Sequence, residues 1–169
     1  GSRPVVLNRD QPDGASLTVV DDDYGTVLAR LGDLGAVSAA AIVGPRAYLA
    51  GSVDRLRDLA QLQVVDLADP TRPTPIDTIP IPLVETAYLF ASSNRLLAAG
   101  WARKAGEHRG ELESALCILD IGMQASPVVA GCAQATPPPR TPTSWALDPD
   151  GQHLYAAGNG LTVLRLELP

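Results

Sequence analysis

Hydrophobic residues recur along the chain in short runs, each ended by glycine, proline or acidic residues. Four of these runs share one pattern, typified by LQVVDL: residues 17–22, 62–67, 116–121 and 161–166. Their starts at positions 17, 62, 116 and 161 lie 45, 54 and 45 residues apart. Self-similarity at such a period indicates a repeat architecture, in which each copy is one supersecondary unit.

A second series of apolar runs, each stopped by glycine, precedes the last three copies at 47–51, 96–100 and 154–158, with 5–7 as a degenerate first member. Further apolar runs follow the first series at 26–31, 75–81 and 128–132, and others precede the second series at 37–43, 86–91 and 144–147. Each repeat therefore predicts four strands, a to d. The spacing predicts an all-β chain, a β-propeller of about four repeats with four-stranded antiparallel blades.

Turn chemistry supports this division. Gly158-Asn-Gly160 joins two strands with the Asn-Gly pair that a type I′ hairpin requires. Asp-Pro-Asp-Gly at 148–151 predicts a tight turn between strands a and b of the last repeat. Prolines cluster at 70–82 and 137–142, beside strand d, where a ladder N–H can be spared.

We expect a single domain over residues 1–169, with repeats at about 3–35, 36–82, 83–139 and 140–169, and we interpret residues 1–2 as an expression scar. The first repeat lacks strand a, and the last ends directly after strand c. Two arrangements stay open, a four-bladed ring and a part of a larger ring. Pairing with a second copy, a homodimer, or with another chain would supply missing blades, because an open propeller exposes strand edges.

Composition narrows the class of partner. Lys plus Arg number 13 against 19 Asp plus Glu, for a net charge of −6. This balance works against binding to nucleic acid or to anionic membranes. No apolar stretch approaches the roughly 20 residues that cross a bilayer, so we expect no nucleic-acid partner and no membrane insertion.

Residues 62–76 resemble the LVIVD repeat, in which an apolar strand ending in Asp leads through Asp-Pro and a further Pro into the last strand of a blade. Residues 116–129 follow the same plan with glycine and methionine in place of Asp-Pro, and the first repeat departs most, at 21–25. Residues 148–158 are similar to a stretch found in bacterial propellers of the surface-antigen and lactonase type. The resemblance implies a structural module and carries no activity with it.

Cys117 and Cys132 lie on the strands that flank the 122–127 connection, nearly equidistant from its centre. Antiparallel pairing would bring them close together, so a cross-strand disulfide is feasible. A disulfide would indicate an extracellular or periplasmic protein, whereas two small buried thiols remain the alternative.

The connections between strands b and c differ in length, and those at 52–61 and 101–115 are insertions. The longer one combines an aromatic side chain with both charge signs, and binding residues concentrate on loops over rigid scaffolds. Its candidate binding residues are Trp101, Arg103, Lys104, Glu107, His108 and Arg109. A solvated charged loop, with its tryptophan packed against the blade, is the alternative.

The remaining polar residues favour structural roles. Three adjacent aspartates at 21–23 do not have the alternating spacing of a calcium loop and predict a turn. Asp66 and Asp120 recur at one position of strand c, where we expect each carboxylate to bond a neighbouring group within its blade. His108 and His153 fall at opposite ends of their blades, so we predict no catalytic residues, metal site or cofactor.

The function that this pattern favours is a non-catalytic, exported module that displays rim loops for protein or carbohydrate binding. A second reading is a fragment of a larger propeller enzyme, a hydrolase or quinoprotein, whose catalytic residues lie outside this chain. A third is a structural assembly domain. Convergent carboxylates or histidines on the strands a would favour the enzyme, but those segments supply mainly Ala, Ser, Thr and Val.

Overall fold

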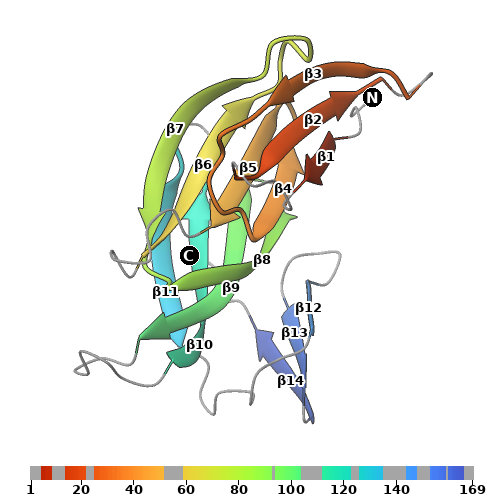
Figure 1. Cartoon of the computed structure of the whole chain (residues 1–169). Coiled ribbons are helices and arrows are strands. Elements are labelled where there is room, and N and C mark those ends of the chain that lie inside the picture. The colour runs from red at the N-terminus through yellow and green to blue at the C-terminus, as the bar shows by residue number, and fades with distance from the viewer. Residues whose placement is uncertain are drawn as a thin grey trace.

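Every regular element that the computed structural model describes is a β-strand (Figure 1). The structure describes residues 5–8, 14–21, 25–51, 59–92, 94–103, 112–122, 126–134, 144–147, 153–158 and 160–165. All strand pairs in these ranges are antiparallel, which confirms the all-β prediction. No helix long and apolar enough to span a bilayer occurs in the part of the chain that the structure describes.

The strands form four sheets, and each sheet consists of strands that follow one another in the sequence. Sheet 1 contains β1 (Val5–Asn8), β2 (Ser16–Val20) and β3 (Val27–Leu31). Sheet 2 contains β4 (Ala39–Val43), β5 (Arg46–Gly51), β6 (Ala60–Asp66) and β7 (Thr74–Ile81). Sheet 3 contains β8 (Glu85–Ser92), β9 (Arg95–Arg103), β10 (Leu112–Asp120) and β11 (Val128–Gln134). Sheet 4 contains β12 (Ser144–Leu147), β13 (His153–Gly158) and β14 (Gly160–Arg165).

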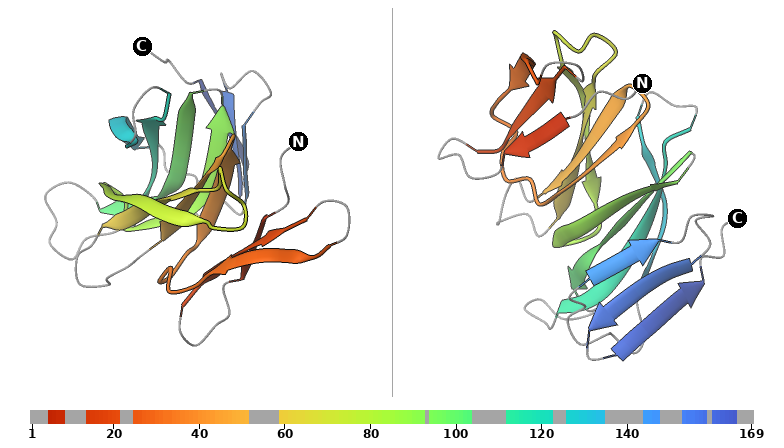
Figure 2. Two further views of the ribbon diagram at one scale, coloured as in Figure 1. Left: turned by 90° about the horizontal axis from the view of Figure 1, so that it is seen from above. Right: turned by 90° about the vertical axis from the view of Figure 1, so that its right-hand side faces the viewer.

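Sheets 2 and 3 contain all four predicted strands, in the order a, b, c, d across the sheet. Among the described residues, sheet 1 contains strands b to d and sheet 4 contains strands a to c. The sheets follow one another through the molecule, with sheets 1 and 4 at opposite ends (Figures 1 and 2). The inner strands β4 and β8 contact each other, so sheets 2 and 3 meet along their strands a. Asn159 and the predicted turn at 148–151 lie outside the described residues.

A β-bulge recurs where strand c pairs with strand d. The register shifts between Val19 and Val20 in sheet 1, between Val64 and Val65 in sheet 2, and between Ile118 and Leu119 in sheet 3. These positions are equivalent in the repeat, since each lies two residues after the leucine that opens the shared pattern. A bulge increases the local twist, so the same device turns the outer strand of each of these three sheets.

The core lies between the sheets, because strand b is apolar on both faces. We call the face of a sheet that points toward the next sheet in the chain its forward face, and the opposite one its backward face. In β5, Tyr48 and Ala50 belong to the forward face, whereas Ala47 and Leu49 belong to the backward face. All four side chains are at most 1% exposed. Strand b is thus buried on both sides, as expected for the middle of a stack of sheets.

Three apolar clusters fill the spaces between successive sheets. Between sheets 1 and 2 lie Leu17, Val19, Leu34, Val37, Ala47, Leu49 and Val65. Between sheets 2 and 3 lie Tyr48, Ala50, Leu62, Val64, Ile81, Leu83, Leu96, Ala98, Cys117 and Leu119. Between sheets 3 and 4 lie Leu97, Ala99, Leu116 and Leu154, with Tyr88 and Phe90 packed against them. Each sheet therefore depends on its neighbours to cover its apolar surface.

Backbone hydrogen bonds tie the start of strand c to the link that leads into the next sheet. Ala15 N donates to the Gly35 carbonyl at 2.8 Å, and Ala60 N donates to the Leu83 carbonyl at 2.5 Å. The Gln63 side chain also donates from Nε2 to the Leu34 carbonyl at 3.0 Å, so strand c of sheet 2 holds the link from sheet 1. These bonds fix how one sheet follows the next.

Candidate binding rim

Among the described residues, the strand pairing at the end of sheet 3 where strand b runs into strand c extends farther than at the same end of sheet 2. In sheet 2 the pairing of β5 with β6 ends at Gly51, but in sheet 3 the pairing of β9 with β10 continues for three residues past Gly100. Trp101, Ala102 and Arg103 therefore form a two-stranded ribbon with residues 112–114. The long predicted rim loop thus begins as an ordered β-ribbon.

Side chains on one face of this ribbon form the best-defined polar and aromatic group at the rim. Trp101 pairs with Ser114, and Arg103 pairs with Leu112, so the four side chains share one face, which we call the ribbon face. Trp101 and Arg103 are half-buried, Ser114 is buried, and Leu112 is 52% exposed. The opposite face packs inward, because Ala102 contacts the cluster between sheets 2 and 3.

Strand a anchors the ribbon from the inner side. Glu85, at the start of β8, pairs with Trp101, and Val84 N donates to the Trp101 carbonyl at 2.7 Å. Glu85 is exposed, so a carboxylate stands beside the tryptophan on the strand that leads into the sheet. Trp101 and Arg103 were predicted as rim residues, but Glu85 and Leu112 were not. Leu112 lies within the predicted insertion at 101–115, but only the pairing register shows that it shares a face with Trp101, and only the register places Glu85 beside the tryptophan.

The four other predicted rim residues, Lys104, Glu107, His108 and Arg109, lie outside the described residues, as do residues 52–58 of the shorter insertion. Their predicted role in binding stays a prediction. The histidine pair is untested for the same reason, since only His153 falls in the described part of the chain, in β13 opposite Arg165.

The inner strands meet through a small polar group next to the rim. Ser38 Oγ donates to the Thr86 carbonyl, and it also lies 3.2 Å from the Ala50 carbonyl. Ser38 therefore joins sheet 2 to sheet 3 at the start of their strands a. The Thr86 side chain is fully buried, and its Oγ1 has no hydrogen-bond partner within the described residues. Both side chains are small and uncharged, in line with the composition predicted for strands a.

The recurring strand-c aspartates have the structural role that the repeat predicts. Asp66 Oδ1 accepts a hydrogen bond from Ala68 N at 2.8 Å, and Asp120 Oδ1 accepts one from Gly122 N at 2.9 Å. Each carboxylate closes a turn two residues along the chain, as Asp side chains commonly do. At the first of the three adjacent aspartates, backbone bonds of Asp21 close the connection, which agrees with a turn, and 22–23 lie outside the described residues.

A further aspartate caps the proline-containing link after strand c of sheet 2. Asp69 Oδ1 accepts hydrogen bonds from Thr71 N at 3.0 Å and from Thr71 Oγ1 at 2.7 Å. The hydrogen bond from the Thr71 hydroxyl, followed by that from its N–H, lowers the pKa of Asp69 below its ordinary value of 3.8. In the part of the chain that the structure describes, no three His, Cys, Asp or Glu residues gather into a metal-binding group.

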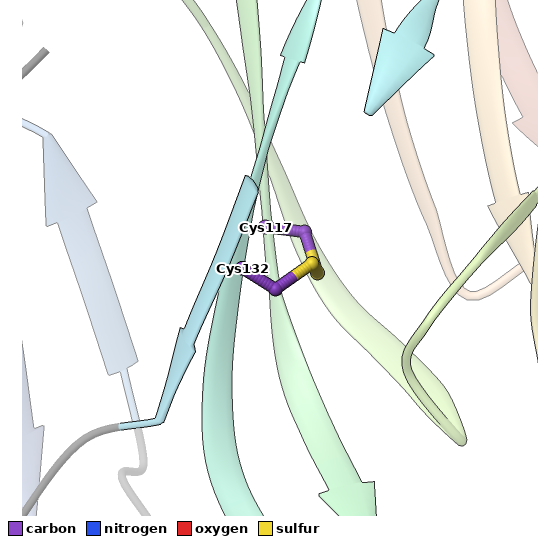
Figure 3. Close-up of a disulfide and its surroundings, with 2 residues drawn as sticks. All are labelled: Cys117 and Cys132. Atoms are coloured by element: carbon purple, nitrogen blue, oxygen red, sulfur yellow. A yellow bond between two sulfur atoms is a disulfide. The ribbon is translucent and has the colours of Figure 1, made fainter. Parts of the chain in front are cut away.

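The two cysteines form the predicted cross-strand disulfide. Cys117 in β10 stands directly opposite Cys132 in β11, their Cα atoms are 4.1 Å apart, and their sulfur atoms are bonded (Figure 3). Cys117 is fully buried in the cluster between sheets 2 and 3, whereas Cys132 lies on the exposed outer strand. The alternative of two separate buried thiols was wrong. Disulfides form and persist mainly in oxidising compartments.

Comparisons with known proteins place the chain by its fold. No protein-family model and no curated protein sequence matches it. Among solved structures, the fold is similar to a candidate 6-phosphogluconolactonase from Bacteroides fragilis, with 13% sequence identity and a TM-score of 0.62 over 90% of this chain and 44% of that one. It is also similar to a candidate 6-phosphogluconolactonase from Bacteroides uniformis, with 12% identity and a TM-score of 0.65 over 96% of this chain and 49% of that one. A third similar structure is hydrazine synthase from Kuenenia stuttgartiensis, with 13% identity and a TM-score of 0.64 over 95% of this chain and 49% of that one. These likenesses show a propeller-like all-β fold, and the chain spans about half the length of the structures it matches.

Proposed function

We propose that the chain forms four consecutive blades of a larger β-propeller ring and acts as a non-catalytic module that binds a ligand at its rim. The position of sheets 1 and 4 at opposite ends supports a part of a ring over a closed four-bladed ring (Figure 2). The share of the matching structures that the chain spans supports the same reading. The repeat plan, including its resemblance to LVIVD repeats, supports the propeller assignment.

The ribbon face carries the proposal of binding. Sheets 2 and 3 share one plan, and among the described residues the main difference between them at this end is the extension that holds Trp101 and Arg103. Tryptophan and arginine dominate the energetically important positions of protein interfaces, and an exposed aliphatic side chain such as Leu112 adds apolar contact area. A protein or carbohydrate ligand fits an aromatic and charged surface of this kind.

The disulfide supports export. A crosslink between β10 and β11 would be reduced in most cytosolic proteins, so we place the protein outside the cytoplasm, in the periplasm or beyond. A rim that displays loops to the surroundings is consistent with that location.

Binding can be tested without a known ligand by selecting phage-displayed peptides against the oxidised chain and by probing a glycan array with it. We expect ligands whose affinity falls at least about tenfold for Trp101→Ala and Arg103→Ala, since interface hot spots of these types exceed about 1.4 kcal/mol. Val128→Ala, on the outer strand of the same sheet and 47% exposed, is the matched control. Equal binding by the Trp101 variant and the control, or no ligand from either screen, would contradict the proposal.

A second candidate is a segment of a larger propeller enzyme whose catalytic groups lie on other blades. It is favoured by the fold likeness to candidate 6-phosphogluconolactonases of about twice the length. Hydrolysis of 6-phosphogluconolactone by the purified chain, above the spontaneous rate and abolished by a single substitution, would favour this candidate over the binding module.

A further inference from the structure

The two end sheets present the kind of surface that is buried elsewhere in the stack. In sheet 4, Tyr155 pairs with Val163, as Tyr48 pairs with Val64 in sheet 2. The sheet 2 pair lies on the forward face and is at most 1% exposed, because sheet 3 covers it. Val163 is 50% exposed and Tyr155 is half-buried. Sheet 4 therefore has an interior-type forward face, with no described sheet against it.

The backward face of sheet 1 is its counterpart at the other end. Val6 pairs with Thr18, as Leu49 pairs with Gln63 in sheet 2, so Val6 occupies the position of Leu49. Leu49 is 1% exposed against sheet 1, whereas Val6 is 53% exposed. Val20 differs from its equivalent in sheet 2 in the same way, since Val20 is half-buried whereas Val65 is fully buried.

Stacked repeats that end in solvent normally carry a polar outer face on their terminal units, which keeps the array soluble. Single exposed valines are ordinary on a protein surface. Here, however, both exposed valines lie at positions through which successive sheets contact each other. Val163 lies on the forward face of sheet 4, and Val6 lies on the backward face of sheet 1. In the described part of the chain, the stack therefore has an apolar contact face at each end, and each of these faces complements the other.

We propose that the forward face of sheet 4 binds the backward face of sheet 1 of a second copy of this chain. Two copies, related by a two-fold axis, then form both contacts at once and close into one ring. The contact continues the interface already present between sheets 1, 2 and 3, where a forward face packs on a backward face. Two copies also supply the length that the matching structures have in one chain, since this chain spans 44% to 49% of them.

The first measurement is the mass of the oxidised full chain by size-exclusion chromatography with light scattering, over a hundredfold range of concentration. We expect a species of twice the 17.7 kDa chain mass. Val163→Asp and Val6→Asp each place a charge in both contacts of the ring and should weaken the dimer at least about a hundredfold. Val128→Asp, at 47% exposure on the outer strand β11, should leave the dimer intact.

Mixing the two variants identifies the arrangement. In a mixed pair, the chain with Val6→Asp still has its native Val163, and the chain with Val163→Asp still has its native Val6, so one of the two contacts is native. We expect the mixture to recover dimers that neither variant forms alone. Circular dichroism checks that each variant is folded, and Val163→Thr and Val6→Thr provide milder versions if an aspartate prevents folding.

A monomer at every concentration would overturn the pairing, because the faces would then be covered by blades from elsewhere or by nothing. A dimer weakened by Val163→Asp but unaffected by Val6→Asp would also overturn it, since that pattern indicates contact between two identical faces. Either result leaves the binding proposed for Trp101 intact, because the ribbon face belongs to neither end sheet.

Discussion

Alanine at Gly100 should destabilise the protein, whereas alanine at Gly131 should not. A Cβ atom at Gly100 would overlap the Glu85 carbonyl oxygen and lie 3.0 Å from both the Glu85 carbonyl carbon and Thr86 Cα. These are backbone atoms of strand a, so no side-chain rotation can relieve the overlap. At Gly131, in β11, a Cβ would meet no atom within 4 Å. The two glycines belong to one sheet and differ in what surrounds them.

The two substitutions are expected to change the free energy of unfolding in opposite directions. Overpacking a well-packed site costs about 1–3 kcal/mol, and contact with backbone on a neighbouring strand places Gly100→Ala toward the upper end, at about 2 kcal/mol or more. For a chain of this length that lowers Tm by about 4–8 °C. Gly131→Ala removes backbone freedom from the unfolded chain without a clash, so it should stabilise by about 0.5 kcal/mol. Gly51→Ala should behave like Gly100→Ala, because its Cβ would lie 2.8 Å from Val37 Cα.

The assay is urea and thermal unfolding of the oxidised chain, followed by far-ultraviolet circular dichroism, with the three variants and the parent at one concentration. A fixed concentration matters because any association would add to the apparent stability. The reasoning fails if Gly100→Ala lies within about 0.5 kcal/mol of the parent, or if Gly131→Ala loses as much stability as Gly100→Ala. The first outcome would mean that strand a does not approach strand b as closely as the structure has it, and the second that the loss of stability does not come from that approach.

Three further perturbations test other parts of the fold. Reduction of the disulfide between Cys117 and Cys132, which are 15 residues apart, should lower the free energy of unfolding by about 3 kcal/mol in urea titrations, and an unchanged midpoint would contradict this. Asp120→Ala should cost about 1 kcal/mol through loss of the hydrogen bond to the N–H two residues on, whereas Asp120→Asn, which can still accept it, should cost less. Because the pKa of Asp69 is lowered in the folded state, its carboxylate stabilises the fold at pH values above the unfolded pKa, and this contribution is lost as the pH falls through the folded pKa. Thr71→Val should raise the pKa of Asp69 in an NMR titration. No change in that pKa would refute the role of the Thr71 hydroxyl.

Local patterns were sufficient to predict the strands, because each strand type leaves a distinct mark on the sequence. Strand b is a short apolar run stopped by glycine, and the structure gives the physical reason at Gly51 and Gly100, where the backbone of strand a or of the residues just before it leaves no room for a Cβ. Strand c ends in an aspartate whose carboxylate closes the following turn at Asp66 and Asp120. The disulfide was predictable for a similar reason, since Cys117 and Cys132 lie at equal distances from one connection.

Contacts between sheets could not be read from the sequence. The run at 47–51 within strand b is apolar at every position, so its pattern does not say that Tyr48 faces forward and Leu49 backward. Only the pairing register and the recurring bulge settle which side chain meets which neighbour. For the same reason Glu85 was not predicted at the rim, because it lies on another strand and reaches Trp101 only through strand pairing. Leu112 lies within the predicted insertion, but only the register shows that it shares a face with Trp101.

The parts of the structure that repeat and the part that does not repeat have different roles. The bulges, the strand-c aspartates and the strand-b glycines recur with little change between sheets 2 and 3, and each one acts on the backbone. They set how one sheet twists and follows the next, which any propeller of this plan requires. The extension of β9 and β10 beyond Gly100 has no counterpart among the described residues of sheet 2, and the stacking of the sheets does not require it. Since function resides in sites added to a fold, the ribbon with Trp101 and Arg103 is where a search for a ligand should begin.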